Sequence, residues 1–231
     1  MLIKNLKNFI HNLKKEINEI KNKNDKDLSE KDEEIKNLKK EINEIKKILQ
    51  PLNEYIQKEK ERKKKKEEEK NNILNKVKNW IAPGKTVTFN LIFKKTRDGD
   101  TADIFHGFCD NKGKTLIILE TTKGRKFGGF TNENWDQSGQ WKYRNSNDFV
   151  FSIDLNKVYK HKGGTYSTVG DKNYGPVFGD SRPSQCDILF QDNTLNVGYT
   201  TNGPYNSNKE LNYGEEKYET KEMEVYQVFI N

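Results

Sequence analysis

The 231-residue sequence contains very little cysteine, since Cys109 and Cys186 are its only two. Domains held together by disulfides carry more, so the sequence excludes a disulfide framework and predicts reduced thiols. No stretch approaches the roughly 20 consecutive apolar residues that span a bilayer. The first ten residues mix polar side chains among the apolar ones, unlike a signal peptide. We therefore expect a soluble, cytoplasmic protein without a membrane span.

Aromatic residues are scarce in the first third of the chain. Of the 25 Phe, Trp and Tyr residues, only Phe9 and Tyr55 precede Trp80. Residues 1–79 hold 23 Lys and Arg against 16 Asp and Glu, whereas residues 80–231 hold 19 of each. Large rings supply much of the area that a small domain buries. This division predicts a charged arm followed by one globular domain, and about 150 residues suffice for a single core.

The apolar residues of the arm recur at alternating intervals of three and four, which is the a/d pattern of a coiled coil over residues 1–56. The positions are Ile3, Leu6, Ile10, Leu13, Ile17 and Ile20, followed by Leu28, Ile35, Leu38, Ile42, Ile45 and Leu49, with Leu52 and Ile56 continuing the second run. We expect these residues to make the protein a homo-oligomer, with the number of strands left open. The alternatives are a single solvated helix and a helix that packs on a foreign partner.

The ten-residue sequence NLKKEINEIK occurs twice in the arm, at residues 12–21 and 37–46. The offset of 25 residues is three heptads plus four, a stutter that unwinds a supercoil locally without ending it. Asn24 and Asp27 occupy core positions just before the register shift and predict a weak point there. Pro51 predicts the end or a kink of the second helix, because it lacks a backbone N–H and clashes with the preceding turn.

Residues 57–79 are predicted to form a charged linker or helix. The run KEKERKKKKEEEK at 58–70 has no apolar side chain to bury, so it is either a lone charged helix or a flexible spacer. Its basic block at 62–66 is followed at once by Glu67, Glu68 and Glu69, which cancel the field within a Debye length. We therefore expect no nucleic-acid binding.

Short β-prone runs alternate with turn residues from Pro83 onwards. The predicted strands are 87–93, 115–121, 127–130, 149–154, 158–161, 187–191 and 223–230. Residues 101–109 predict a helix that buries Phe105 and begins at Asp100 as its N-cap. Many short strands with few helices favour an α+β chain in which residues 80–231 form a twisted β-sandwich with peripheral helices.

Motifs in residues 80–231 follow one another in a recognisable order. They are Arg97-Asp98-Gly99-Asp100, Phe105-His106, Cys109-Asp110, Gly113-Lys114-Thr115-Leu116, Lys126-Phe127-Gly128-Gly129-Phe130, Trp135, Phe149-Val150-Phe151-Ser152-Ile153, Val177-Phe178-Gly179, Asp187-Ile188 and Met223-Glu224-Val225-Tyr226. In this order and spacing the segment resembles the TLDc domain family. The resemblance implies a sandwich of two antiparallel sheets with helices packed outside. The link from Gly179 to Asp187 is longer than in many relatives, which leaves the shape of that loop open.

No constellation of residues predicts catalysis or a metal centre. His106 and Cys109 lie three residues apart, but a zinc site needs three or four ligands and no second cluster supplies them. The acidic group at Asp98, Asp100 and Asp103 lacks the glycine and the closing glutamate of a calcium loop. Neither cysteine has a fixed base beside it or a family signature around it. We expect no metal, no cofactor and no enzymatic activity.

Two motifs are candidates for binding, and each has a structural alternative. The corner at Arg97 and Asp98 precedes a helix, where an anion could bind, although local pairing and helix capping by Asp98 and Asp100 are preferred. The run Gly124–Gly129 lacks the ending of a phosphate loop and predicts a hairpin turn. The candidate binding residues, which we expect to be mostly structural, are Arg97, Asp98, Gly99, Asp100, His106, Lys126, Phe127, Gly128, Gly129, Phe178, Gly179 and Asp187.

The resemblance implies a non-catalytic protein-interaction module that docks on a macromolecular assembly. Members of the TLDc family regulate the vacuolar-type proton ATPase and are linked to oxidation resistance without an agreed catalytic centre. That pump, at the cytosolic face of acidic organelles, is the first partner implied. The alternative is a fixed component of a ciliary or cytoskeletal assembly, with the arm lying along a filament. A peroxide-consuming thiol protein is a third option, but it lacks a resolving pair and an activating base.

Overall fold

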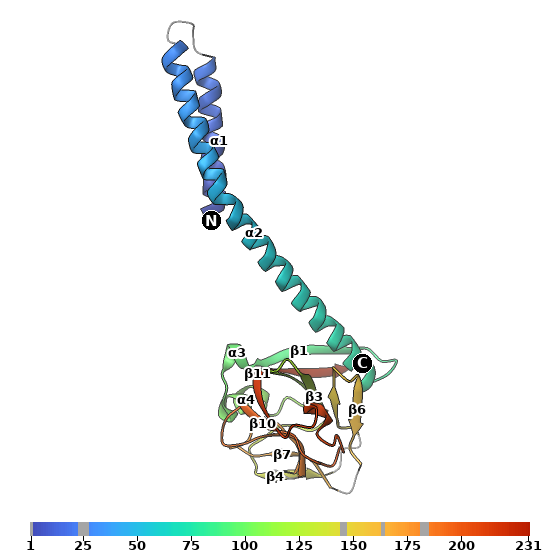
Figure 1. Cartoon of the computed structure of the whole chain (residues 1–231). Coiled ribbons are helices and arrows are strands. Elements are labelled where there is room, and N and C mark those ends of the chain that lie inside the picture. The colour runs from blue at the N-terminus through green and yellow to red at the C-terminus, as the bar shows by residue number, and fades with distance from the viewer. Residues whose placement is uncertain (1, 23–27, 144–146, 163–164, 181–184) are drawn as a thin grey trace. The chain divides into compact units, whose positions relative to one another are not determined.

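The computed structural model describes residues 2–22, 28–143, 147–162, 165–180 and 185–231 (Figure 1). The chain forms two compact units, residues 1–72 and residues 73–231, which are described separately below. Within the described residues no helix is both long enough and apolar enough to cross a membrane.

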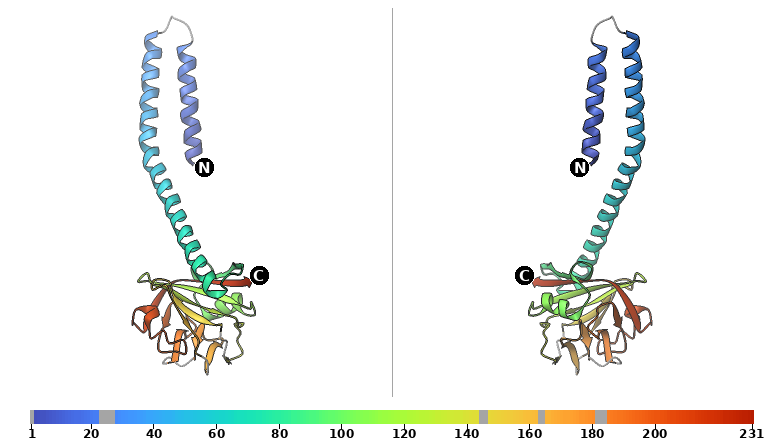
Figure 2. Two further views of the ribbon diagram at one scale, coloured as in Figure 1. Left: turned by 90° about the vertical axis from the view of Figure 1, so that its right-hand side faces the viewer. Right: turned by 90° about the vertical axis from the view of Figure 1, so that its left-hand side faces the viewer.

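The first unit is a hairpin of two helices. Helix α1 spans Leu2–Lys21, and helix α2 spans Leu28–Ile81. The views in Figures 1 and 2 agree that α1 lies beside the first half of α2 and runs in the opposite direction. The apolar cluster between the helices consists of Leu13, Ile17, Ile35 and Ile42, which are buried, and of Ile10, Ile20, Leu38 and Ile45, which are partly buried. Eight of the fourteen a/d residues of the arm thus pack against each other within one chain.

The register shift in the arm is a change of direction and not the stutter we expected. Helix α1 ends at Lys21, and α2 begins at Leu28 as its antiparallel neighbour. A pairing within one chain satisfies both apolar stripes, so no continuous supercoil is required. The predicted weak point at Asn24 and Asp27 lies outside the described residues.

Of the two outcomes expected at Pro51, an end or a kink of the helix, the end is wrong, because the helix continues to Ile81. Proline removes one backbone hydrogen bond, and the carbonyl of Lys47 that loses its donor belongs to an exposed turn where water can replace it. The charged run at 58–70 is helical. Its side chains form ion pairs at helical spacing, such as Arg62 with Glu59 at 3.0 Å and Lys64 with Glu68 at 3.8 Å.

The second unit is built on one hydrogen-bonded series of antiparallel strands. In chain order they are β1 (Val87–Lys94), β2 (Thr115–Thr121), β3 (Lys126–Thr131), β4 (Gln140–Tyr143), β5 (Phe149–Ser152), β6 (Lys157–Lys160), β7 (Tyr166–Gly170), β8 (Val177–Gly179), β9 (Cys186–Phe190), β10 (Val197–Tyr199) and β11 (Lys217–Ile230). Their order in space is β4-β7-β8-β9-β10-β11-β2-β3-β5-β6, and β1 also pairs with β11. The short helices are α3 (Lys95–Asp98), α4 (Ala102–Cys109) and η2 (Glu210–Asn212). The α+β class is therefore confirmed.

The 14-residue strand β11 joins the two halves of the sheet. Its first residues pair with β10, and later residues pair with β2 on one side and β1 on the other. Rings from both halves meet in a single core, where Phe127 of β3 lies edge-on to Tyr218 at 5.1 Å and Phe178 of β8 lies edge-on to Trp135 at 5.7 Å between ring centroids. All seven predicted strands are present, whereas β4, β7, β8 and β10 were not predicted.

The last turns of α2 belong to this second unit. Val77 is fully buried in an apolar cluster that includes Leu116 of β2, and Ile73 and Leu74 pack against the same cluster. The Trp80 ring lies 5.6 Å from the ring of Phe151 on β5. Helical residues before position 80 therefore contribute to the hydrophobic packing of the sheet.

Candidate functional site

The twelve predicted binding residues do not gather at one site. The structure divides them into an ion-pair corner at Arg97, a pair of glycines inside a strand, and buried side chains that hold loops to the sheet.

The corner at Arg97 is a closed network of charges. The Arg97 guanidinium donates from Nε and Nη2 to the Asp98 carboxylate, each at 2.7 Å, and is the main cause of the lowered pKa of that carboxyl. Asp98 also accepts from the backbone N–H of Lys94 at 2.7 Å. The Lys94 ammonium lies 2.6 Å from Glu224 and 3.2 Å from Glu222. The charged groups of this corner therefore bond to one another.

The expected helix caps at Asp98 and Asp100 are wrong. Thr101 is the N-cap of α4, and its Oγ1 accepts from the backbone N–H of Ile104 at 3.4 Å. Asp100 instead accepts from the side chain of Asn196 at 2.6 Å. The helix begins one residue later than predicted, so the extended backbone that a cap requires occurs at Thr101. The Asp98 carboxylate accepts hydrogen bonds from the Arg97 side chain and the Lys94 backbone N–H and does not cap α4.

His106 is a buried anchor. Its Nδ1 lies 2.6 Å from Oδ1 of Asp110, and its Nε2 lies 2.9 Å and 3.0 Å from the carbonyl oxygens of Asp171 and Tyr174. Both ring nitrogens are therefore engaged in tying α4 to the turn after β7. Across the described ranges, no group of three or more His, Cys, Asp or Glu side chains is arranged to hold a metal ion.

Both cysteine thiols are buried. Burial is the largest cause that raises the pKa of Cys186 to about 12, and it raises the pKa of Cys109 as well. A nucleophilic or redox-active cysteine needs a lowered pKa and access to solvent. This environment argues against thiol catalysis at either position.

Gly128 and Gly129 lie inside β3, so the predicted hairpin turn was placed too late in the sequence. The chain turns just before β3, where Gly124 has a φ of +80° and donates to the carbonyl of Thr121 at 2.9 Å. A Cβ atom on Gly128 would lie 1.9 Å from the carbonyl oxygen of Ile117, and one on Gly129 would lie 2.4 Å from the Phe178 ring. Glycine is required at both positions because neighbouring atoms lie too close for a Cβ, and not because the chain turns there.

Asp187, near the start of β9, holds a loop to the sheet. Its buried carboxylate accepts from the backbone N–H of Tyr205 at 3.0 Å and of Ser207 at 2.9 Å, while burial raises its pKa. Gly179 has a φ of +117°, and a Cβ there would lie 2.8 Å from the carbonyl oxygen of Gln185. Residues 181–184, in the link whose shape the sequence left open, lie outside the described residues.

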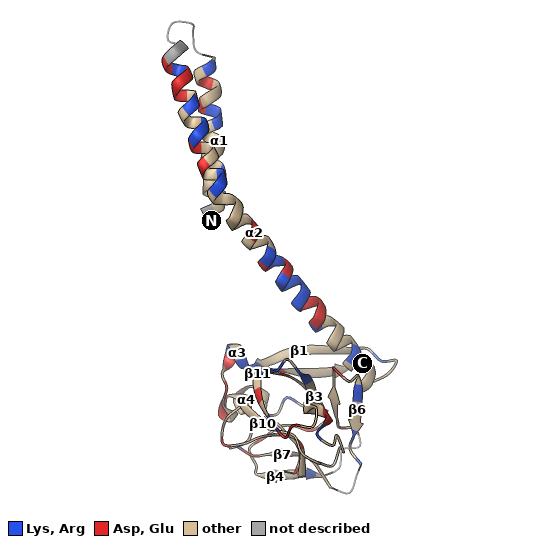
Figure 3. Ribbon diagram, viewed as in Figure 1, with Lys and Arg blue, Asp and Glu red and all other residues tan. Residues whose placement is uncertain are grey.

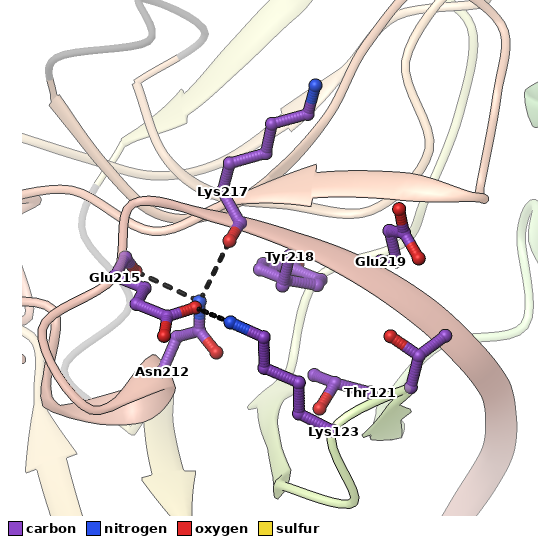
Figure 4. Close-up of a pocket in the computed structure, with 8 residues that line it drawn as sticks. Thr121, Lys123, Asn212, Glu215, Lys217, Tyr218 and Glu219 are labelled. Atoms are coloured by element: carbon purple, nitrogen blue, oxygen red, sulfur yellow. Dashed lines mark hydrogen bonds and ion pairs between the residues drawn. The ribbon is translucent and has the colours of Figure 1, made fainter.

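A surface pocket of about 350 Å³ lies elsewhere, between the turn after β2 and the start of β11 (Figure 4). The Lys123 ammonium lies 2.6 Å from the Glu215 carboxylate, and Nδ2 of Asn212 donates to the carbonyls of Glu215 and Lys217 at 3.0 Å and 3.1 Å. None of the twelve predicted residues lines this pocket. Its two lysines and two glutamates balance in charge, and among the described residues the buried hydroxyl of Tyr218 has no hydrogen-bond partner, so the pocket does not favour a ligand of one charge.

Three aromatic side chains on β4 and β7 form a cluster at the surface of the domain. We call Trp141, Tyr143 and Tyr166 the aromatic patch; Trp141 is 49% exposed and Tyr143 is 58% exposed. The Tyr166 ring lies 5.2 Å from Trp141 and 5.6 Å from Tyr143 between centroids. Tryptophan and tyrosine are enriched at the centres of protein interfaces. The sequence analysis missed this patch, although the alternation in QWKY was a possible signal.

Two comparisons with known proteins agree with the motifs. The family model described as the TLDc domain matches residues 64–229. The MTOR-associated protein MEAK7 of Danio rerio is 29% identical over 70 residues, which are 30% of this chain and 15% of that protein. The chain thus covers only a small part of the length of this relative.

Proposed function

The chain belongs to the TLDc domain family, and we propose that it is a non-catalytic interaction module whose TLDc domain docks on a macromolecular assembly. The observation that carries this proposal is a contrast on the domain. Polar side chains of the family motifs, such as Arg97, His106 and Asp187, bond to neighbouring groups of the domain, whereas large rings such as Trp141 and Tyr143 are exposed. A surface of this kind suits protein binding better than chemistry.

The vacuolar-type proton ATPase is the partner that we propose first, because members of the TLDc family regulate this pump. In this hypothesis the protein acts at the cytosolic face of acidic organelles, and protection against oxidative stress is the alternative role that the family resemblance offers. The name of the relative from Danio rerio describes it as MTOR-associated, which supports the coarser proposal that such domains work by associating with other proteins.

A fixed role in a ciliary or cytoskeletal assembly is the second candidate. The observation that favours it is the arm, where α2 is a single helix of 54 residues with a largely charged surface. Such a helix suits lateral attachment along a filament. In this case the arm and not the domain would carry the affinity.

The test is binding of the purified full chain to the purified cytosolic sector of the pump and, in parallel, to microtubules. We expect binding to the pump sector, and we expect replacement of Trp141 and Tyr143 by alanine to weaken it at least about tenfold, as for interface hot spots. Phe229→Ala is the matched control, because Phe229 is also an exposed ring, 46% exposed on β11. Binding to microtubules alone would favour the second candidate. Equal loss with the Phe229 variant would argue against docking at the aromatic patch.

A further inference from the structure

The two helices of the hairpin each carry one copy of the same ten-residue sequence. Residues 12–21 lie in α1, and the identical residues 37–46 lie in α2. In this repeat Leu13 corresponds to Leu38, Ile17 to Ile42 and Ile20 to Ile45. All six residues belong to the apolar cluster between the two helices. The apolar residues with which α1 packs on α2 therefore occur in the same spacing on α2 itself.

We propose that α1 is a built-in competitor for self-association: when it is released, α2 pairs antiparallel with α2 of a second copy. The expected homo-oligomerisation through the a/d residues then depends on opening of the hairpin. This inference concerns the arm, and it does not depend on which assembly the TLDc domain binds.

The repeat indicates that a second copy of this chain can take the place of α1 beside α2. Helix α2 accepts NLKKEINEIK within its own chain, and another α2 presents the same apolar residues with the same flanking lysines and glutamates. Because α1 runs antiparallel to α2 (Figures 1 and 2), a second α2 in its place would also run antiparallel and form a two-fold symmetric contact.

The apolar stripe of α2 is also longer than the cluster that α1 covers. Leu49 is buried, and Leu52 and Ile56 continue the a/d spacing at half-buried positions outside the cluster. An α2 partner can present its copy of the repeat in the place of α1, so an exchange of partners keeps the contacts of the repeat. The basic and acidic side chains that flank the seam alternate along the helices (Figure 3). Opposite charges are thus available beside either pairing.

In the full chain, pairing of α1 with α2 is favoured over pairing between two copies, because the two helices are joined. A short connection gives the neighbouring helix an effective concentration of about 1 mM, which is about 100 times a protein concentration of about 10 μM. If the two pairings have similar contacts, the full chain is mainly monomeric at that concentration. Release of α1 should then strengthen dimerisation, because neither copy has to open its hairpin first.

The test uses two full-length variants with the same substitution in the same local sequence. Ile17→Asp places a charge in the seam of α1 only, whereas Ile42→Asp places it in the seam of α2, which both pairings need. Sedimentation equilibrium should show a dimer for Ile17→Asp and a monomer for Ile42→Asp. A monomeric Ile17→Asp variant, or a wild-type dimer that Ile17→Asp weakens, would overturn the proposal.

A peptide experiment separates competition from simple unfolding of the arm. A synthetic peptide of residues 1–22 added to the Ile17→Asp variant should return the dimer to monomers, because it restores the face that α1 provides in the closed chain. The same peptide with Ile17→Asp is the control and should have no effect. If neither peptide changes the sedimentation of the dimer, α1 is not a competitor and the proposal fails.

Discussion

At the scale of single residues, Asp148 is the most unusual carboxyl group of the domain. It is completely buried, and its oxygens accept from Oγ1 of Thr131 and from the backbone N–H of Asn132, both at 2.9 Å. Burial is the largest cause that raises the pKa of Asp148 to about 6. These polar contacts oppose burial without overcoming it, so the folded state holds the proton more tightly than the unfolded chain does.

The raised pKa predicts the pH dependence of stability. An unfolded aspartate has a pKa of about 3.9, so between about pH 4 and pH 6 the folded state binds more protons than the unfolded state. The free energy of unfolding should therefore fall as the pH rises through this window, by on the order of 2–3 kcal/mol for this group. Urea unfolding of Asp148→Asn at about pH 4 and pH 7 should lack this fall. Asp154→Asn, at an exposed acceptor of the Lys126 N–H, should retain it.

Gly128 and Gly129 make a second prediction at this scale. Gly128→Ala drives a Cβ into a backbone carbonyl that cannot move alone, whereas Gly129→Ala meets a Phe178 ring that can shift. We expect losses of about 3 kcal/mol or more for the first and about 1–3 kcal/mol for the second, measured by thermal unfolding.

Gly107→Ala in α4 is the matched control for these two glycines. A Cβ there has no neighbour within 4 Å, and alanine favours the helix, so stability should be unchanged or higher. Partner binding by the Gly128 variant should fall together with its stability. Binding lost at full stability would show that β3 forms the docking surface itself.

At the scale of elements, the sequence predicted those strands that carry their own hydrophobic signal. Strand β2 was placed with the right bounds because it lies between β11 and β3 and is largely buried, which gives the unbroken run LIIL. Strands β4, β8 and β10 are three or four residues long, and β10 contains Gly198, so their pairing partners and not their composition make them strands. The hairpin of the arm was missed because an a/d pattern is the same whether its partner lies in another chain or in its own.

The candidate site was predictable only in part, for a similar reason. The family motifs were found from sequence, but their side chains serve the fold, and their hydrogen bonds reach residues far away in the chain, as from His106 to Asp171 and from Asp187 to Tyr205. The aromatic patch depends on the register that places Tyr143 opposite Tyr166. Spacing along one strand does not reveal such a pairing.

The end of α2 gives a prediction at the element scale. A fragment that starts at residue 80, the boundary expected from sequence, lacks Val77 and its neighbours Ile73 and Leu74, which pack on the sheet. Removing a buried valine side chain alone costs about 1–3 kcal/mol. We therefore expect the fragment 80–231 to unfold at a clearly lower temperature than the fragment 70–231. Equal melting temperatures would show that the helix end adds nothing to the domain.

At the scale of the whole molecule, charge and apolar surface are distributed unequally. Residues 1–79 carry a net charge of +7, whereas residues 80–231 carry none. The domain has exposed rings at the aromatic patch, and the arm has Lys and Glu side chains over most of its surface. The two parts should therefore respond differently to salt when they bind a partner.

This difference predicts how binding of the full chain depends on ionic strength. Docking through the neutral domain and its aromatic patch should change by less than about threefold between about 50 and 500 mM salt, because exposed charges contribute little to it. Attachment through the arm, by contrast, would weaken steeply, since the Debye length falls from about 14 Å to about 4 Å over that range. Surface plasmon resonance with the immobilised cytosolic sector of the pump measures the affinity at both salt concentrations. A steep loss that Trp141→Ala leaves unchanged would assign the affinity to the arm and contradict docking through the domain.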